Sequence, residues 1–201
     1  MMKKITRTIF LVVLVFLAYQ FYVIRTNVKQ VLSFQSTVQE VLISSQSPAS
    51  EDLILAMIYT ETKGLKADVM QSSEAETGTT NTITDSRESI QVGVAYLNQM
   101  FAAAEAANLD SWTAVQAYNY GPGYISYVAA NGGENTIELS KNYSLTIVAP
   151  SLGNSDGETY TYYHPIAVLN GGKLYVNGGN IYYSRQVEFN QYLIRFMKLF
   201  I

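Results

Sequence analysis

The seventeen residues from Thr8 to Ile24 constrain this chain more than any other feature, because they form an almost continuously apolar segment. At a helical rise of about 1.5 Å per residue, such a segment spans about 25 Å, the lower limit for crossing a bilayer. Tyr19 and Tyr22 lie near its end, where an aromatic ring with a polar tip suits the boundary between lipid and water. The segment therefore predicts a single N-terminal transmembrane helix.

The charges around this segment predict its orientation. Lys3, Lys4 and Arg7 precede it, and the first 25 residues contain no acid. Because positive charge favours the cytoplasmic side, we expect residues 1–25 to form a cytoplasmic stub and signal-anchor helix, and residues 26–201 an extracellular domain. A cleaved signal peptide, which would give a secreted protein, is the alternative, but bulky residues follow Ala18 where cleavage needs small ones. A buried core helix is a further alternative that the basic flank disfavours.

The composition excludes several kinds of chemistry. The chain has no cysteine and one histidine, His164, which excludes disulfide scaffolds, thiolate nucleophiles, iron–sulfur clusters and multi-histidine metal sites. Beyond residue 25 it has nine basic and sixteen acidic residues, a formal charge of 9 − 16 = −7. Such an acidic body is poorly suited to nucleic acid, because that affinity depends on neutralising phosphates. We expect no cofactor, no metal ion and no nucleic-acid partner, which leaves carboxylates and tyrosines for chemistry.

Helical periodicity and capping residues predict a mainly α-helical body. Ser50, Asp85 and Asp110 are typical N-cap residues, and each precedes an apolar periodic segment. The predicted helices cover residues 28–42, 51–63, 86–107, 111–120, 122–130, 144–150 and 189–200. Between them, residues 65–84 are polar and predict a structured loop, and residues 151–180 predict loops or a small hairpin. His164 falls in this second region and is expected to be a loop residue.

Glu61 is the carboxylate that its position singles out. It lies four residues after Met57 and three after Ile58, so it shares the apolar face of its predicted helix. Removing a carboxylate from water disfavours the charged form and raises its pKa, which a general acid near neutral pH requires. The alternative is a glutamate in the last helical turn that bends into solvent.

Asp68 follows Glu61 by seven residues, across Gly64, where the chain can fold back. Two carboxylates on either side of a glycosidic bond can act as an acid and as a nucleophile or base. A spacing across a loop allows both a retaining and an inverting separation, so the stereochemistry stays open. The alternative is that Asp68 only forms a turn.

Four segments in this order resemble the motifs of the lysozyme-like superfamily, which includes goose-type lysozymes and soluble lytic transglycosylases. The four segments are Glu61-Thr-Lys-Gly, Asp68-Val-Met-Gln-Ser-Ser-Glu, Ser89-Ile-Gln-Val-Gly-Val-Ala-Tyr-Leu and Ala117-Tyr-Asn-Tyr-Gly-Pro-Gly-Tyr-Ile. Residues 81–90 make the likeness closer to the branch found in Gram-positive cell-wall hydrolases, and the segment from Gly179 resembles the family's final motif. The resemblance covers residues 28–201 and implies a lysozyme-like fold.

The resemblance also implies roles for single residues. The family's catalytic acid falls on Glu61, and a second acidic residue implicated in the wall-hydrolase branch falls on Asp68. Ser184 departs from the β-branched apolar residue that is usual at its position. The expected substrate-binding residues are Gln71, Ser72, Ser73, Tyr118, Asn119 and Tyr183.

These residues and the resemblance together predict a peptidoglycan hydrolase. The expected enzyme is a muramidase that cleaves the β-1,4 bond between N-acetylmuramic acid and N-acetylglucosamine by carboxylate general acid catalysis. Its expected partners are peptidoglycan glycan strands and, through the N-terminal helix, the membrane, while the oligomeric state stays open. A lytic transglycosylase, which leaves anhydro-muramic ends, and a non-catalytic cell-wall-binding protein remain as alternatives.

Overall fold

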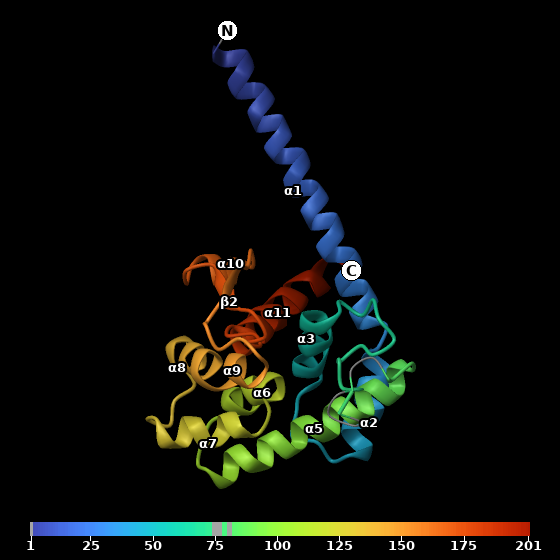
Figure 1. The fold of residues 1–201 in the computed structure, drawn as a ribbon. Helices are drawn as coiled ribbons and strands as arrows, with labels where there is room; N and C mark the ends of the chain where they lie inside the picture. The colour runs from blue at the N-terminus through green and yellow to red at the C-terminus, as the bar shows by residue number, and fades with distance from the viewer. Residues whose placement is uncertain (1, 74–77, 80–81) are drawn as a thin grey trace.

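The computed structural model describes residues 2–73, 78–79 and 82–201, with side chains from residue 5 onward. Glu74 and Asn81, which belong to the motifs quoted above, lie outside the described residues, as do the side chains of Lys3 and Lys4. One long helix extends from a body of shorter packed helices (Figure 1). The predicted fold class, mainly α with a preceding apolar helix, is confirmed.

Helix α1 (Met2–Leu32) joins the apolar N-terminal segment to the body without a break. Its first part is exposed, whereas Val28 and Val31 are fully buried in the core of the body. Within the described ranges, α1 is the one helix long and apolar enough to cross a membrane. The predicted transmembrane segment is therefore the outer part of a helix whose inner end belongs to the domain core.

The single helix predicted over residues 28–42 is wrong, because the chain turns after α1. Helix α2 (Gln35–Ser44) continues from that turn, away from the free end of α1 (Figure 1). Ser33 Oγ donates a hydrogen bond to the carbonyl oxygen of Gln30 at 2.6 Å, and such local bonds compete with the helical ladder. Val38 of α2 is as deeply buried as the core residues of α1, so the apolar spacing runs on across the break.

Helix α3 (Glu51–Glu61) runs through the middle of the body, and its residues 53–59 are all buried. Ser50 caps it as predicted, since its hydroxyl oxygen accepts a hydrogen bond from the Leu53 N–H at 3.2 Å. The helix ends before Gly64, which has a φ of +71° that suits glycine. A Cβ at Gly64 would also lie 2.9 Å from Phe34, so the chain passes very close to the turn after α1.

Helices α5 (Ser86–Ala106) and α6 (Ser111–Tyr120) begin at the predicted N-caps. The Asp85 carboxylate accepts a hydrogen bond from a helix N–H at 3.0 Å, and the Asp110 carboxylate accepts one at 2.7 Å. The buried face of α5 includes Ile90, Gly93, Val94, Leu97, Met100 and Ala104, which recur at helical spacing.

Short elements follow in the next part of the chain. Helix α7 (Gly123–Ala130) matches its prediction, whereas α8 (Ile137–Tyr143) was not predicted, because its short sequence lacks apolar periodicity. The helix predicted over residues 144–150 is a π-helical turn (Ser144–Val148) that leads into α9 (Ala149–Ser151). These elements lie beside α6 (Figure 1), and α7 and α8 share a hydrophobic cluster with α5 and α6.

A small hairpin occupies the region where loops or a hairpin were predicted. Strand β1 (Thr159–Thr161) pairs antiparallel with β2 (Lys173–Tyr175), with Tyr160 opposite Leu174. Helix α10 (Pro165–Val168) lies in the connection. His164 precedes α10, and its Nδ1 accepts a hydrogen bond from the helix N–H two residues on at 3.3 Å. His164 is thus a loop residue that caps a short helix.

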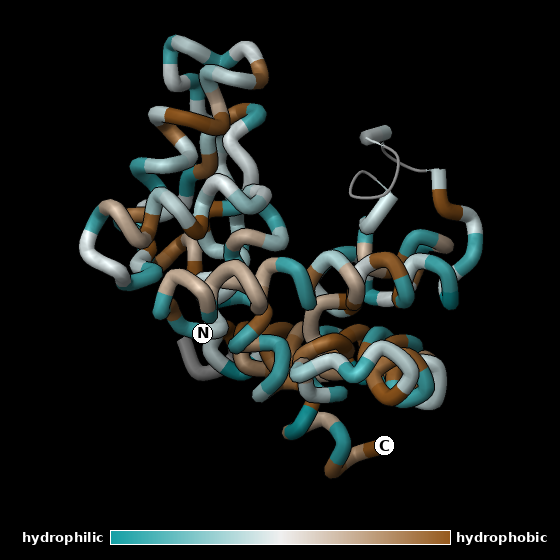
Figure 2. The backbone as a smooth tube through the Cα atoms, turned by 90° about the horizontal axis from the view of Figure 1, so that it is seen from below, coloured by the Kyte–Doolittle hydropathy of each residue, from teal (hydrophilic) through white to brown (hydrophobic). Residues whose placement is uncertain are grey.

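Helix α11 (Tyr183–Met197) closes the body and leads into a 3₁₀ turn (Lys198–Phe200). It begins six residues before the predicted start, because its first turn carries polar side chains, such as those of Ser184 and Arg185, that hydrogen-bond to Asn135 in place of apolar periodicity. Helix α11 packs chiefly against α3 and also against α6. Buried residues of α3, α6 and α11 belong to one hydrophobic cluster, and Figure 2 shows hydrophobic segments grouped within the body. This packing brings the C-terminal end of α3 close to the start of α11.

Candidate active site

A pocket of about 490 Å³ opens between the end of α3, the loop that follows it, and the loops after α6 and α9. The predicted site residues that line it are Glu61, Asp68, Gln71, Ser72, Ser73, Tyr118 and Asn119. Further lining comes from Tyr96, Tyr120, Gly121, Val148, Leu152 and Gly179. The fold therefore brings seven of the eight predicted residues together, and Tyr183 is the exception.

Glu61 lies in the last turn of α3 and is only partly exposed. Burial raises the pKa of its carboxyl to about 7. The Tyr183 hydroxyl lowers this pKa, the negative charge of Asp68 raises it, and the positive charge of Lys66 lowers it. The Glu61 side chain lines the pocket and is not fully exposed, which disfavours the alternative of a glutamate that bends freely into solvent. The carboxyl can hold a proton near neutral pH.

Tyr183 lies behind Glu61 and does not line the pocket, contrary to its expected place in the cleft. Its side chain is 1% exposed and stacks on Tyr118, with ring centroids 6.3 Å apart and planes 10° from parallel. Its hydroxyl is buried and lacks a well-formed hydrogen bond within the described residues, yet it lies close enough to lower the pKa of Glu61. The reason is that Tyr183 begins α11, whose inner face packs on α3.

Asp68 is 4% exposed, and its two carboxylate oxygens accept hydrogen bonds from serines. Oδ1 accepts from Ser89 Oγ at 2.6 Å and from the Ser72 N–H at 2.9 Å. Oδ2 accepts from Ser73 Oγ at 2.6 Å and from the Ser73 N–H at 3.1 Å. Burial alone would raise the pKa of Asp68, but these hydrogen bonds outweigh it and the pKa is lowered. Asp68 is thus a charged group that ties the loop after α3 to α5.

The hydroxyls of Ser72 and Ser73 are also bonded to protein atoms. Ser72 Oγ donates to the carbonyl oxygen of Ser89 at 2.9 Å. Ser73 Oγ donates to Asp68 and accepts from the Ile83 N–H at 3.0 Å. Both serines are 1% exposed, so their geometry suits the floor of the pocket better than direct contact with a sugar.

Gln71 and Asn119 are the more accessible polar residues of the predicted set. Gln71 has a φ of +50°, and its amide donates to the Asp68 carbonyl oxygen at 3.1 Å and accepts from Lys66 Nζ at 3.1 Å. Asn119 Oδ1 accepts a hydrogen bond from the Asn180 N–H at 2.8 Å, which holds the loop before α11. Each residue therefore shapes a wall of the pocket while part of its side chain stays open to it.

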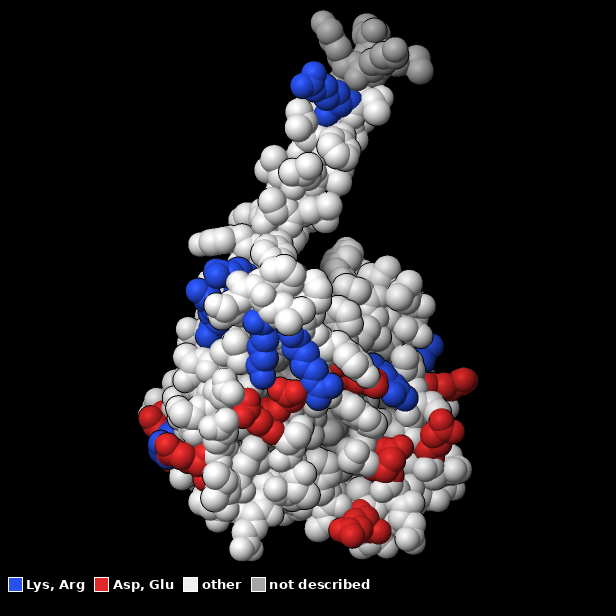
Figure 3. All heavy atoms as spheres, turned by 180° about the vertical axis from the view of Figure 1, so that it is seen from behind, with Lys and Arg blue, Asp and Glu red and all other residues white. Residues whose placement is uncertain are grey.

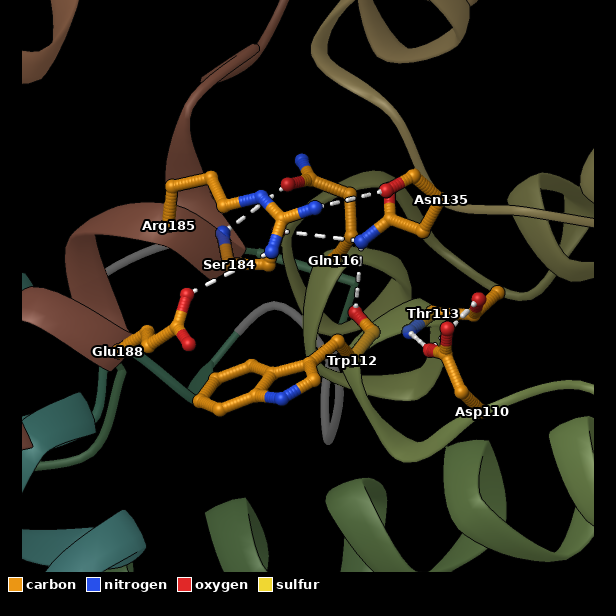
Figure 4. Close-up of polar contacts among 8 residues, drawn as sticks. All are labelled: Asp110, Trp112, Thr113, Gln116, Asn135, Ser184, Arg185 and Glu188. Atoms are coloured by element: carbon orange, nitrogen blue, oxygen red, sulfur yellow. Dashed lines mark hydrogen bonds and ion pairs between the residues drawn. The ribbon is translucent and has the colours of Figure 1, made fainter.

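A polar network joins α6 to the start of α11, the turn that also carries Tyr183 (Figure 4 shows the network). Gln116, which is fully buried, accepts a hydrogen bond from the Ser184 N–H at 3.0 Å. Asn135 Nδ2 donates to Ser184 Oγ at 3.1 Å, and Arg185 donates to the Asn135 carbonyl oxygen at 3.2 Å. The serine at position 184, unusual by the resemblance, is therefore a member of this network.

Tyr96 of α5 lines the pocket although the sequence analysis did not select it. Its ring meets Tyr118 edge-on, with centroids 5.4 Å apart. It lies three residues after Gly93, where a Cβ would be only 2.7 Å from the sulfur of Met70. A glycine inside a helical stripe indicates close packing, and that signal could have marked this part of α5 as a wall of the site.

A larger cavity, of about 720 Å³, lies between the loop before α3, the end of α5 and the start of α6. The predicted site residues do not line it. In the described part of the chain, no three His, Asp or Glu side chains come together in a way that could hold a metal ion. The groups of the smaller pocket that can ionise are Glu61, Asp68 and the tyrosines.

A helical body with a shielded glutamate at the end of its central helix, beside a pocket, defines a lysozyme-like protein. The lysozyme-like family model matches residues 28–191, and the chain belongs to this family. The family resemblance stated from the motifs is confirmed.

Known proteins match this chain over different lengths. The pneumococcal vaccine antigen A homolog of Streptococcus pyogenes is 58% identical over 187 residues, which cover 93% of this chain and 94% of that protein. The bifunctional muramidase/DL-endopeptidase CwlT of Bacillus subtilis is 39% identical over 93 residues, 46% of this chain and 27% of that protein. A crystal structure from Staphylococcus aureus, described as similar to an NLP/P60-family lipoprotein, matches with a TM-score of 0.72 and 30% identity, over 81% of this chain and 52% of that one.

Proposed function

We propose that this chain is a membrane-anchored muramidase that cleaves the β-1,4 bond between N-acetylmuramic acid and N-acetylglucosamine. The observation that carries the proposal is Glu61, a carboxyl shielded from water with a pKa of about 7 on the wall of an open pocket. The partial similarity to a protein named as a muramidase supports the same substrate class.

Glu61 is the general acid in this proposal. Near neutral pH a carboxyl with this pKa holds a proton and is still acidic enough to donate it to the departing glycosidic oxygen. Departure of that oxygen leaves positive charge on the muramic acid ring. The Tyr183 ring keeps water away from the inner side of the carboxyl, because it is buried and does not line the pocket, and the largely buried Tyr118 ring lies beside the carboxyl on the pocket wall.

Asp68 acts through its charge in this proposal. Its lowered pKa keeps it ionised, and a negative charge near the pocket favours the cation that develops on the sugar. Direct attack by either oxygen would disturb hydrogen bonds from Ser73 or Ser89. We therefore favour electrostatic stabilisation with water as the nucleophile over a covalent intermediate on Asp68.

A lytic transglycosylase is the second candidate, and the same hydrogen bonds favour it. In that reaction the hydroxyl of the muramic acid itself attacks, so one acid–base group is enough. A carboxylate whose oxygens already accept four close hydrogen bonds leaves Glu61 as the group free to exchange protons with substrate. The nature of the product distinguishes the two reactions.

The test is digestion of purified sacculi by the full chain, followed by mass spectrometry of the released fragments. Reducing ends support the muramidase, and anhydro-muramic ends support the transglycosylase. Glu61→Gln is expected to abolish release, whereas Glu105→Gln, at an exposed position of α5, is expected to retain it. Unchanged release by Glu61→Gln would refute the catalytic assignment, and binding without release by the unaltered chain would favour a non-catalytic wall-binding protein.

We further propose that the chain stays in the membrane through α1, with residues 26–201 outside the cell. The apolar part of α1 supports this proposal, as do the basic residues before it. Signal cleavage near Ala18 would give a secreted protein instead. The mass of the mature protein distinguishes the two, since cleavage removes the first segment.

A further inference from the structure

The outer face of α11 carries a row of exposed apolar side chains. Phe189, Tyr192 and Phe196 lie three and four residues apart on this helix, with exposures of 44%, 63% and 54%. The following turn adds Leu199 at 77% and Phe200 at 46%. Exposed apolar residues scattered singly are ordinary, but a contiguous row indicates a contact surface. We call the set Phe189, Tyr192, Phe196, Leu199 and Phe200 the outer stripe.

The outer stripe is continuous with α1 at the place where that helix leaves the body. Phe200 meets Phe21 edge-on, with ring centroids 5.4 Å apart. Arg25 Nε donates a hydrogen bond to the Phe200 carbonyl oxygen at 2.9 Å, which fixes the C-terminal turn to α1. In Figure 1, α11 runs across the direction of α1 and lies on the side of the body from which α1 emerges. The stripe thus lies beside the proposed membrane anchor.

The length of α1 indicates what covers the stripe. Phe21 is in contact with Phe200 of the body, so the apolar part of α1 that extends beyond the body runs from Thr8 to Gln20. This part has 13 residues. Such a length spans about 20 Å, whereas the hydrocarbon core of a bilayer is about 30 Å thick. Tilting of α1 would shorten its reach further. If α1 crosses the bilayer, the surface of the body beside it must therefore approach the lipid.

Charged side chains beside the stripe fit the same arrangement. Seen from behind, Lys and Arg side chains gather where α1 meets the body, and most acidic side chains lie farther from α1 (Figure 3). Arg195 and Lys198, at the same end of α11, pair with Asp52 and remain partly exposed. Aromatic and basic residues together are typical of the membrane interface, where rings meet the acyl boundary and cations meet phosphates.

We infer that the outer stripe is a second lipid contact, which seats the catalytic body on the bilayer beside its anchor. The inference rests on the membrane anchoring proposed above and is independent of the reaction catalysed. Helix α1 enters the core unbroken, and Gln30 of α1 donates a hydrogen bond to the carbonyl oxygen of Gly64, just after α3, at 3.0 Å. A second lipid contact would therefore hold the end of α3 at a constant height above the bilayer.

Site-specific fluorescence tests the inference, because the chain has no cysteine and single cysteines can be labelled alone. The full chain is reconstituted in phosphatidylcholine–phosphatidylglycerol vesicles, with an environment-sensitive probe at Tyr192→Cys or Leu199→Cys. Lipids carrying a nitroxide near the headgroup serve as the quencher for these two positions, and lipids carrying a nitroxide deep on the acyl chain serve for position 16. The matched control is Ile43→Cys in α2, where an apolar residue is 79% exposed, as Leu199 is 77% exposed, but α2 points away from the free end of α1. Phe16→Cys reports insertion of α1 itself.

Probes at positions 192 and 199 are expected to shift to shorter emission wavelengths and to lose fluorescence in quencher vesicles, while the probe at 43 does neither. Equal behaviour at 43, 192 and 199, with quenching at 16, would overturn the inference and leave the anchor standing. No quenching at 16 would overturn the anchor and the inference together. If the shift at position 192 grows with the protein-to-lipid ratio and the probe is not quenched by the labelled lipids, the stripe contacts a second copy of the chain. That result would also overturn the inference.

Discussion

Tyr183 and Tyr118 lie nearly parallel next to Glu61, with ring centroids 6.3 Å apart and planes 10° from each other. The two tyrosines come from the start of α11 and the end of α6, so the shielding of the acid depends on how those helices meet. The Tyr118 hydroxyl donates to the Met70 carbonyl oxygen at 3.0 Å, whereas the Tyr183 hydroxyl is left to Glu61. Substitutions around this pair therefore test the acid directly.

Tyr183→Phe should move the pH dependence of activity. The Tyr183 hydroxyl lowers the pKa of Glu61, so its removal should raise that pKa above about 7. Because the general acid works in its protonated form, the alkaline limb of the activity profile should move to higher pH. Turbidity clearance of sacculi from pH 5 to 10 measures this. Tyr163→Phe, at a position 83% exposed, is the control, and an unmoved or lowered alkaline limb in Tyr183→Phe would contradict the role of the hydroxyl.

Glu61→Gln should be inactive but more stable than the unaltered chain above pH 7. The raised pKa means that the folded state binds this proton more tightly than the unfolded chain does, so stability falls as pH rises from about 4.5 to about 7. A neutral amide avoids that loss, which amounts to about 3 kcal/mol for a shift from 4.5 to about 7. Denaturant unfolding at pH 5 and pH 8 measures the difference in the free energy of unfolding between Glu61→Gln and the unaltered chain. This difference should be small at pH 5 and larger at pH 8. Equal stability at pH 8 would argue that the carboxyl is well solvated.

Asp68→Asn should destabilise the fold as well as reduce activity. The amide cannot replace a carboxylate that accepts from Ser72, Ser73 and Ser89, and the loss should be roughly 2–4 kcal/mol at pH 7. Because the pKa of Asp68 is lowered by folding, this stability is present above about pH 4 and disappears as pH falls through the folded pKa. The variant should therefore lose less on acidification than the unaltered chain. Asp156→Asn, on an exposed loop, should change neither quantity, and a fully stable Asp68→Asn would mean that the serines do not depend on the charge.

Gly93→Ala should lower stability even though alanine favours helices. The new Cβ would lie 2.7 Å from the Met70 sulfur and 2.9 Å from its Cβ, so Met70 must move. We expect a net loss of about 1–3 kcal/mol from this overpacking, together with reduced activity, because Met70 receives the Tyr118 hydrogen bond. Gln99→Ala, at an exposed position of the same helix, should be neutral in thermal unfolding. If Gly93→Ala is more stable than the unaltered chain, Met70 can move away from the new Cβ without cost, which would contradict this prediction.

Residues close together in the sequence could be predicted because local interactions decide their structure. Ser50, Asp85 and Asp110 cap helices at the predicted positions, since each side chain bonds to an N–H three residues away. The apolar periodicity after Asp85 and Asp110 also predicted helices α5 and α6. The break after α1 was not predicted because the spacing of the core-facing residues continues through it. Helix α8 was not predicted because its short sequence has no apolar periodicity.

The local sequence by itself determined where Glu61 lies on its helix, that an apolar anchor-length segment precedes the body, and that carboxylates and tyrosines are the groups available for chemistry. Only the tertiary structure decided how those groups are used. Asp68 is held by Ser89 of α5 as well as by serines of its own loop, Tyr183 lies behind the acid, and the outer face of α11 lies beside α1. Each of these outcomes depends on contacts between segments far apart in the chain, and a periodic pattern carries no information about which faces will meet.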